Sequence, residues 1–208
     1  MLATNPAQPV KVGRLLQSGI AGFRVAVAVG QIEAVAYGAL VIVPVSPDLS
    51  IYGVVSDIAF ESDPLTKVMA GAIDIPPSAF ESLRAQGANV EVSVFTVGYA
   101  ANGSIVHGLP PRPPLGLDEL HPCSDRQILD FTQEPLYLRH LFKKLDDPLV
   151  ADLTAAHVGI VQTVHSRNGQ QPWLARALGA LIEEKKKDPG VVRILLSLQA
   201  ALPLEVLE

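Results

Sequence analysis

Short apolar runs separated by turn-forming residues dominate the first half of the chain. Residues 39–45 and 51–58 are rich in Val and Ile, and the segment SPDLS between them supplies the residues of a tight turn. These runs are too short for helices, so residues 38–58 predict a β-hairpin. Because an isolated hairpin is marginally stable in water, we expect the neighbouring segments to complete a closed or nearly closed sheet.

A period of two predicts further strands before this hairpin. Residues 10–17 alternate in a way that places Val12 and Leu16 inward and Lys11 outward. A clearer alternation follows in FRVAVAV, residues 23–29, whose inward positions are Phe23, Val25, Val27 and Val29. The first sixty residues therefore predict about four strands, the spacing expected of a small barrel.

A second hairpin is predicted between residues 90 and 107. Residues 90–99 alternate apolar and polar positions, and Asn102-Gly103 is a strong turn signal because both residues tolerate positive φ. Residues 104–107 then form the returning strand, and we expect this hairpin to complete the barrel. Between the two hairpins, Ser78 and Gly87 mark the start and end of a short helix over residues 78–86.

The proline-rich segment GLPPRPPLG, residues 108–116, is predicted to end the β region, because prolines cannot donate to a strand ladder. We interpret it as a semi-rigid exit from the barrel. The alternative interpretation is a ligand for a proline-recognising module. The predicted domains are thus a barrel with its exit segment over residues 1–122 and a helical unit over residues 123–208.

From Ser124 onward the apolar period changes to that of helices. Asp147-Pro148 and Asp188-Pro189 each place a capping carboxylate before a proline, which is typical of a helix start. We predict helices at about 125–130, 135–145, 148–166, 172–187 and 190–200. The apolar stripe of the longest helix consists of Leu149, Leu153, Ala156, Ile160 and Val164. The fold class is therefore α+β, a small N-terminal β-barrel followed by a helical unit.

The order of these features resembles the HAS-barrel, the β-barrel shared by HerA-type DNA translocases and the heads of rotary ATP synthases. The resemblance rests on VGRLLQSG, FRVAVAV, GALVIVPV, IYGVVSDI and LPPRPPLG in this order, and it covers roughly residues 10–120. In that family an ATPase core with a phosphate-binding loop follows the barrel. This chain has no G-x-x-x-x-G-K-[ST] motif, so the resemblance implies the fold without the ATPase activity, and we expect no nucleotide to bind.

Composition and charge narrow the function classes. Hydrophobic residues make up 49% of the 208 residues and aromatic residues 5%, which indicates a large aliphatic core. The net charge is −5, with 6 basic and 10 acidic residues in 1–122 and 10 basic and 11 acidic residues in 123–208, so neither part has the bulk charge of a nucleic-acid binder. We expect a cytoplasmic protein, because the single cysteine excludes an intrachain disulfide and the sequence shows neither a signal peptide nor a membrane span.

No pattern in the sequence indicates a catalytic or cofactor site. The G-x-S-x-G and H-E-x-x-H motifs are absent, and His157 and His165 are too far apart for the i, i+4 spacing of a paired metal site. A metal site formed by Asp152, His157 and His165 is an alternative to ordinary structural histidines. Cys123 would need a positioned base and a lowered pKa to act as a nucleophile. We therefore predict no catalytic residue, no metal and no cofactor.

Two surfaces of the helical half are candidates for binding. Residues 190–208 hold more apolar side chains than one helix face can bury, so Ile194, Leu195, Leu198 and Leu202 are predicted to form an interface. Arg139, Lys143 and Lys144 gather at one helix and are the possible phosphate contacts.

The favoured hypothesis is a non-enzymatic accessory or assembly module that binds a protein partner or a second copy of itself. A DNA-processing accessory and an enzyme with an unfamiliar site are the alternatives.

Overall fold

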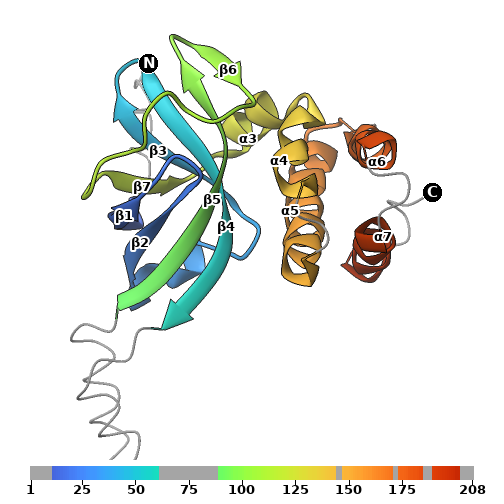
Figure 1. Ribbon diagram of the computed structural model, residues 1–208, viewed down its shortest axis with the longest axis horizontal. Coiled ribbons are helices and arrows are strands. Elements are labelled where there is room, and N and C mark those ends of the chain that lie inside the picture. The colour runs from blue at the N-terminus through green and yellow to red at the C-terminus, as the bar shows by residue number, and fades with distance from the viewer. Residues whose placement is uncertain (1–10, 61–88, 144–146, 171–172, 185–188, 202–208) are drawn as a thin grey trace, which may run out of the picture.

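The computed structural model describes residues 11–60, 89–143, 147–170, 173–184 and 189–201. Within these ranges the chain forms a β-barrel followed by helices, which confirms the predicted α+β class. Figure 1 shows the barrel on one side of the molecule and the helices on the other. The helix predicted at residues 78–86 lies outside the described residues.

The strands form an antiparallel ring. They are β1 (Gly13–Ser18), β2 (Gly22–Ala28), β3 (Leu40–Ser46), β4 (Leu49–Phe60), β5 (Asn89–Ala101), β6 (Ser104–Val106) and β7 (Glu119–Pro122). Their order is β2-β1-β7-β3-β4-β5, and β5 pairs with β2 again, so these six strands close a barrel. A 3-10 helix, η1 (Val29–Ala34), connects β2 to β3. The four strands and both hairpins predicted from the period of two are confirmed.

The closure of the barrel differs from the prediction. The proline-rich segment does not end the β region, because β7 follows it and lies between β1 and β3, where Leu120 pairs with Gly13 and His121 pairs with Ile42. The second hairpin closes the ring through its first strand alone, since β5 pairs with both β4 and β2, whereas β6 pairs with β5 outside the ring. The sequence of β7, ELHP, is too short for its alternation to be recognised, yet the strand is paired on both sides.

The two faces of the central hairpin pack against different cores. Val41 and Val43 point into the barrel, whereas Leu40 and Ile42 point outward and pack under the helices. Because both faces are buried, the run LVIV of β3 is continuously apolar rather than alternating. The buried residues of the barrel interior are aliphatic apart from Phe23, as the low aromatic content predicts.

The register of β1 reverses one predicted orientation, and the strand contains a β-bulge. Leu15 pairs with Val25 and Gln17 pairs with Arg24, so Leu16 is the extra residue of the bulge. Leu15 is 1% exposed and fills the barrel, while Leu16 is 55% exposed. The prediction that Leu16 points inward was therefore wrong, because Leu15 pairs with the inward-facing Val25, and the next residue along the strand faces outward.

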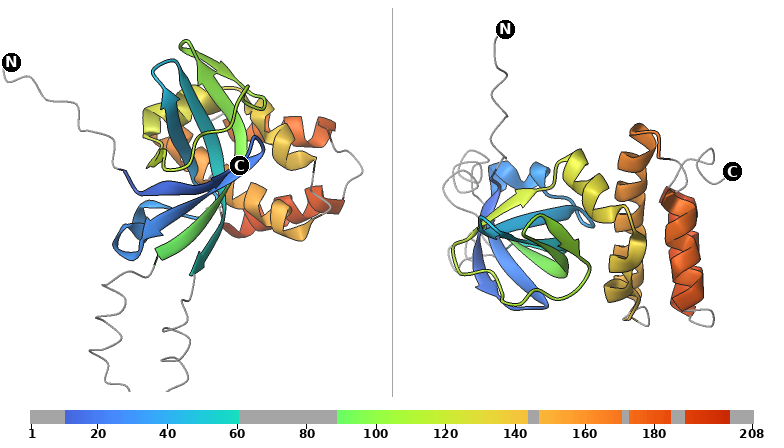
Figure 2. Two further views of the ribbon diagram at one scale, coloured as in Figure 1. Left: turned by 60° about the vertical axis from the view of Figure 1, so that its left-hand side comes forward. Right: turned by 90° about the horizontal axis from the view of Figure 1, so that it is seen from above.

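The helices form the second part of the molecule. They are α3 (Asp125–Thr132), η2 (Pro135–Leu138), α4 (Arg139–Phe142), α5 (Pro148–Arg167), α6 (Trp173–Glu184) and α7 (Pro189–Ala201). Ser124 caps α3 through a capping box with Gln127, and the Asp147 carboxylate accepts a hydrogen bond from the Leu149 backbone at 2.9 Å, as the start signal Asp147-Pro148 predicts. Figure 2 shows α7 on the side of α5 away from the barrel. None of the described helices is both long and apolar enough to cross a bilayer.

A single hydrophobic core joins the helices to the outer surface of the barrel. Tyr52, Val54 and Val97 extend outward from β4 and β5 into this core. From the helical side it receives side chains of α3, η2, α4, α5, α6 and α7. The helices therefore cover one side of the barrel, and the barrel interior forms a separate core.

We expect a fragment of residues 1–122 to fold alone as a β protein, because all the described residues of the barrel interior lie between Val12 and Leu120. The fragment would expose the outward apolar residues of β3 and β4, so it should also associate more readily than the whole chain. Circular dichroism and urea unfolding test this expectation. A fragment without a cooperative transition would show that the barrel depends on the helices.

Candidate binding surfaces and the barrel–helix junction

Two glycines let the helices approach the barrel closely. At Gly38, just before β3, an added Cβ would lie 2.8 Å from the backbone nitrogen of His157 in α5. At Gly98 in β5, an added Cβ would lie 2.7 Å from the Val106 carbonyl oxygen and 2.8 Å from the Phe131 ring of α3. Any larger residue at either position would collide with the backbone or with a packed ring.

Aromatic rings fill the junction that these glycines create. The rings of Tyr52 in β4 and Phe131 in α3 stack with centroids 4.3 Å apart. Tyr137 of η2 lies against Phe131 at 5.2 Å, and His107 lies edge-on to Phe131 at 5.0 Å. Although aromatic residues are only 5% of the chain, several of them gather here, where large rigid side chains can bridge a sheet and helices.

His157 is the buried polar centre of the junction. Its Nδ1 donates to the Gly38 carbonyl oxygen at 2.7 Å, and its Nε2 accepts from the Tyr137 hydroxyl at 2.9 Å. This tautomer satisfies both ring nitrogens and the tyrosine hydroxyl. Burial lowers the pKa of His157 to about 4, so the ring is neutral at physiological pH. Both ring nitrogens of His157 are thus engaged in hydrogen bonds that hold α5 to the barrel and to η2.

The other histidines of the helical half also have structural partners. His165 contacts the Thr132 hydroxyl at 2.8 Å and the Gln170 side chain at 2.9 Å, and its ring stacks on Trp173. Asp152 pairs with Arg193 at 3.4 Å. The alternative metal set of Asp152, His157 and His165 is therefore divided among separate interactions. Among the described residues no three His, Cys, Asp or Glu side chains lie close enough to hold a metal ion.

Cys123 packs against the junction core at the end of β7. Burial raises the pKa of its thiol well above the ordinary value, so the group is protonated at neutral pH. A thiol in this state is a poor nucleophile, and its surroundings are those of a small apolar core residue.

The predicted phosphate contacts are not assembled into one cluster. The Arg139 guanidinium donates to the His107 carbonyl oxygen at 2.7 Å and so connects α4 to the segment that follows β6. Lys143 is exposed at the end of α4, and Lys144 lies outside the described residues. Binding of nucleic acid through these residues stays a prediction.

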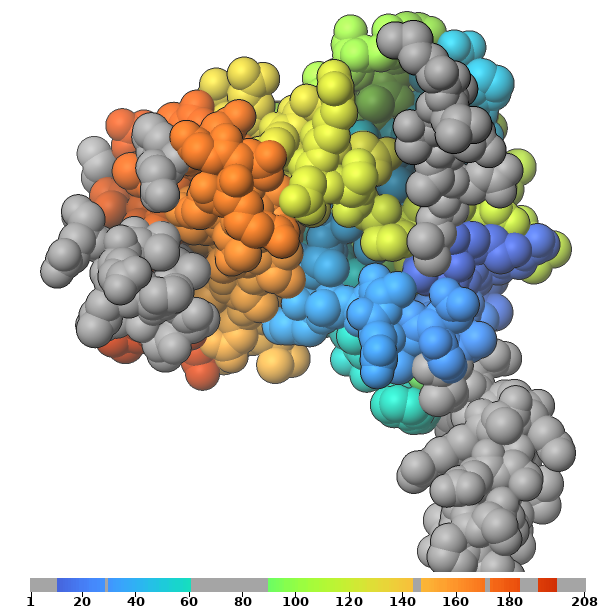
Figure 3. Space-filling model, turned by 180° about the vertical axis from the view of Figure 1, so that it is seen from behind, coloured from blue at the N-terminus to red at the C-terminus, as the bar shows by residue number. Residues whose placement is uncertain are grey.

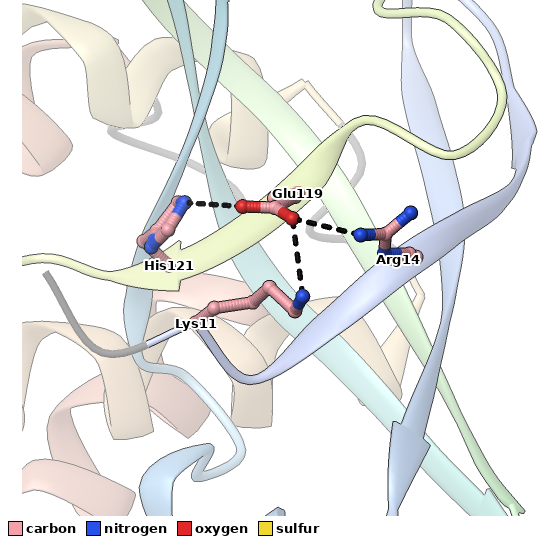
Figure 4. Close-up of polar contacts among 4 residues, drawn as sticks. All are labelled: Lys11, Arg14, Glu119 and His121. Carbon is pink, nitrogen blue, oxygen red and sulfur yellow. Dashed lines mark hydrogen bonds and ion pairs between the residues drawn. The ribbon is translucent and has the colours of Figure 1, made fainter.

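A group of charged side chains lies over the seam where β7 enters the barrel (Figure 4). The Glu119 carboxylate is 3.1 Å from both the Lys11 ammonium and the Arg14 guanidinium, and 4.0 Å from the His121 ring. Hydrogen bonding from Lys11, with the nearby positive charges, lowers the pKa of Glu119. Because Arg14 and Glu119 are directly paired across β1 and β7, we assign this cluster to the register of the seam.

A groove of about 330 Å³ lies at the end of the β1–β2 hairpin, between that hairpin and β5. Its walls include Gln17, Arg24 and Ser93. The Arg24 guanidinium donates to Gln17 and to Glu91, the latter at 2.8 Å, so its charge is already neutralised within the chain. The groove is open to solvent, and its walls hold no converging set of titratable groups. It therefore has the form of a binding groove rather than of a catalytic pocket.

The predicted apolar interface lies on α7, and the structure corrects part of its residue set. Ile194 is 1% exposed and belongs to the junction core, so it is not available at the surface. Leu195 is 38% exposed, as an interface residue requires. The side chain of Leu198 and the whole of Leu202 lie outside the described part of the chain. Val192 and Leu196, which were not predicted, are 59% and 62% exposed.

No protein-family model matches the chain, and no curated protein matches it at a significant level. The resemblance to the HAS-barrel therefore stays a prediction based on the residues quoted for it, while the barrel itself is present.

Proposed function

We propose that this protein is a non-enzymatic assembly module that binds a second copy of itself through the outer face of α7. The proposal includes a relationship of its barrel to that of HerA-like ATPases, supported by the order of the sequence segments and by the six-stranded ring. The observation that carries the binding function is the apolar outer face of α7.

The outer face of α7 consists of Val192, Leu195 and Leu196. These residues are spaced i, i+3 and i+4, so they form one stripe along the helix. The inner stripe, which includes Val191 and Ile194, is already buried against the rest of the helical unit. A helix with apolar residues on both its inner and outer faces needs a second surface to cover it.

The start of α5 extends this surface. The Asp152 carboxylate contacts Arg193 at 3.4 Å and Ser197 at 3.5 Å, so this part of α5 lies beside α7. Leu149 is one helical turn before Asp152 and is 73% exposed. It was predicted to be part of the buried stripe of α5, but the helix begins to be covered only after it. Leu149 and the α7 stripe together supply the apolar centre of an interface.

Charge favours a second copy as the partner. The chain has a net charge of −5, which opposes random self-association, but the outer stripe of α7 contains no charged residue. Arg193, which flanks the stripe, is paired with Asp152 of the same chain. Two such stripes can therefore meet around a two-fold axis without burying an unpaired charge.

We predict that replacing Leu195 and Leu196 together with aspartate converts an assembled protein into a folded monomer of 22.1 kDa. Four buried carboxylates in a two-fold interface would cost more than the apolar contacts supply. Multi-angle light scattering over a range of concentrations measures the mass, and thermal unfolding shows whether the fold is kept.

The matched control is Leu136→Asp, because Leu136 is a 56% exposed leucine on η2, in the same helical unit. This control should assemble as the unsubstituted protein does. The proposal is contradicted if the unsubstituted protein is strictly monomeric at high concentration. It is also contradicted if the α7 variant and the Leu136→Asp control change the measured mass equally.

The nucleic-acid alternative has its own test. Salt-dependent binding of a short duplex that is lost on Lys143→Glu would support it.

A further inference from the structure

Three exposed leucines lie on two adjoining segments of the barrel, far along the chain from α7. Leu16, Leu115 and Leu117, here called the leucine patch, are 55%, 60% and 68% exposed. The segment that holds Leu115 and Leu117 runs beside β1, because the Leu117 backbone donates to the Leu15 carbonyl oxygen at 3.0 Å. Figure 3 shows β1 (dark blue) and this segment (yellow-green) side by side at the right-hand edge of the molecule.

The backbone under the leucine patch is fixed by hydrogen bonds at several points. The Ser18 hydroxyl donates to the Pro114 carbonyl oxygen at 2.6 Å, and the Leu15 backbone donates to the Asp118 carbonyl oxygen at 3.0 Å. The Asp118 carboxylate accepts from the Leu115 backbone at 2.7 Å. The patch is thus a preformed surface, which lowers the entropy lost on binding.

Two irregular backbone features lie under the leucine patch. Leu16 is the extra residue of the β-bulge in β1. Leu117 has φ of +70°, a left-handed conformation that is unfavourable for a leucine. A glycine or asparagine would be more stable at position 117. An exposed leucine in a left-handed conformation points to a role for its side chain outside the folded chain.

Arg112 adds a charge at the edge of the patch. It is exposed, and it has no hydrogen bond or ion pair within the described residues. Each of the seven other arginines in that part of the chain contacts an oxygen of the chain itself; they are Arg14, Arg24, Arg126, Arg139, Arg167, Arg176 and Arg193. Arg112 lies three positions before Leu115, a span of at most about 10 Å. Its guanidinium is therefore available for a carboxylate that approaches the patch.

We propose that the leucine patch and Arg112 form a second docking surface, which binds an acidic, apolar segment of another protein. Apolar side chains of that segment lie on the three leucines, and one of its carboxylates pairs with Arg112. The neighbouring groove begins at Gln17 and Ser18, directly after Leu16, and can accept a further side chain. This surface is on the barrel and is independent of the α7 stripe.

The experiment is a selection of random sixteen-residue peptides, displayed on phage, against the immobilised full-length protein. Peptides that combine apolar residues with Asp or Glu should be enriched. The affinity of a synthetic copy of the best peptide is then measured by fluorescence polarisation. Arg112→Glu should weaken its binding at least tenfold, and changing the responsible carboxylate of the peptide to lysine should restore it.

Leu117→Gly distinguishes docking from a structural role. Removing an exposed leucine from a left-handed position should leave the melting temperature unchanged or raise it, while peptide binding falls at least tenfold. Arg126→Glu is the control for charge, since Arg126 is another exposed arginine, on α3. Leu196→Asp is the control for the other surface, and both controls should bind the peptide normally.

The proposal is overturned if the selected peptides lack acidic residues, or if no peptide is selected. It is equally overturned if Arg112→Glu and Leu117→Gly bind as well as the unsubstituted protein does, or if Leu117→Gly loses both stability and binding. None of these outcomes bears on the light-scattering test of α7, so the two surfaces are judged separately.

Discussion

Replacing Gly38 with alanine should lower the free energy of unfolding by about 2–5 kcal/mol, a large part of the total for a domain of this size. Gly38 has φ of +84°, and any other residue there costs about 1–2 kcal/mol. The new Cβ would also lie 2.8 Å from the His157 nitrogen and 3.0 Å from the Ala156 carbonyl carbon. Relieving that overlap requires α5 to move away from β3, which costs about 1–3 kcal/mol more.

Gly103 provides the matched control for this prediction. Its φ is +78°, close to that of Gly38, but no atom lies within 4 Å of an added Cβ. Gly103→Ala should therefore cost only the backbone strain, about 1–2 kcal/mol. Urea unfolding of both variants measures the difference. Equal losses of unfolding free energy in the two variants would show that α5 does not pack against Gly38 as closely as the structure shows.

Acid should destabilise the protein through His157. The pKa of this ring falls from 6.5 to about 4 on folding, because the buried imidazolium loses its hydration. Between these two values the unfolded chain binds more protons than the folded one, so the free energy of unfolding decreases as the pH falls. The full stability is present above about pH 6.5, and a shift of this size corresponds to a loss of about 3 kcal/mol by pH 4.

The variant His157→Gln isolates this contribution from that of other titrating groups. Glutamine does not titrate, and its amide can still donate to the Gly38 carbonyl oxygen. Chemical unfolding at several pH values should show a loss between pH 7 and pH 4 that is about 3 kcal/mol smaller in the variant. The lowered pKa values of His107, His140 and His165 act in the same direction and persist in both proteins. Identical pH profiles would contradict the neutral, buried state of His157.

Local patterns were sufficient to predict most of the fold. The alternation in FRVAVAV placed Phe23, Val25 and Val27 in the barrel, where they are 4%, 0% and 0% exposed. Asn102 and Gly103 have the positive φ values that their turn signal predicts. These successes share a cause, because period and turn chemistry act over a few neighbouring residues and need no knowledge of the rest of the chain.

The errors concern features that depend on distant segments. The four residues of β7 become a strand only because β1 and β3 leave a gap that they fill. The outward orientation of Leu16 follows from the register of β1 against β2, and Ile194 is buried because α7 packs on other helices. No local signal distinguishes Gly38 and Gly98, where helices touch the barrel, from the other glycines. Arg112 stands out only when the partners of the other arginines are known.

Cross-linking from α7 tests the central claim, that this face joins two copies of the chain, most directly. In a Cys123→Ser background, a benzophenone is attached to Leu196→Cys or, as the control, to Leu136→Cys on η2, and the proteins are irradiated in dilute solution. We predict a product of twice the 22.1 kDa chain mass from position 196, with the cross-link mapped to α7 or to the start of α5 of the second copy. No such product, or equal yields from both positions, would contradict the assignment of α7 as the assembly surface.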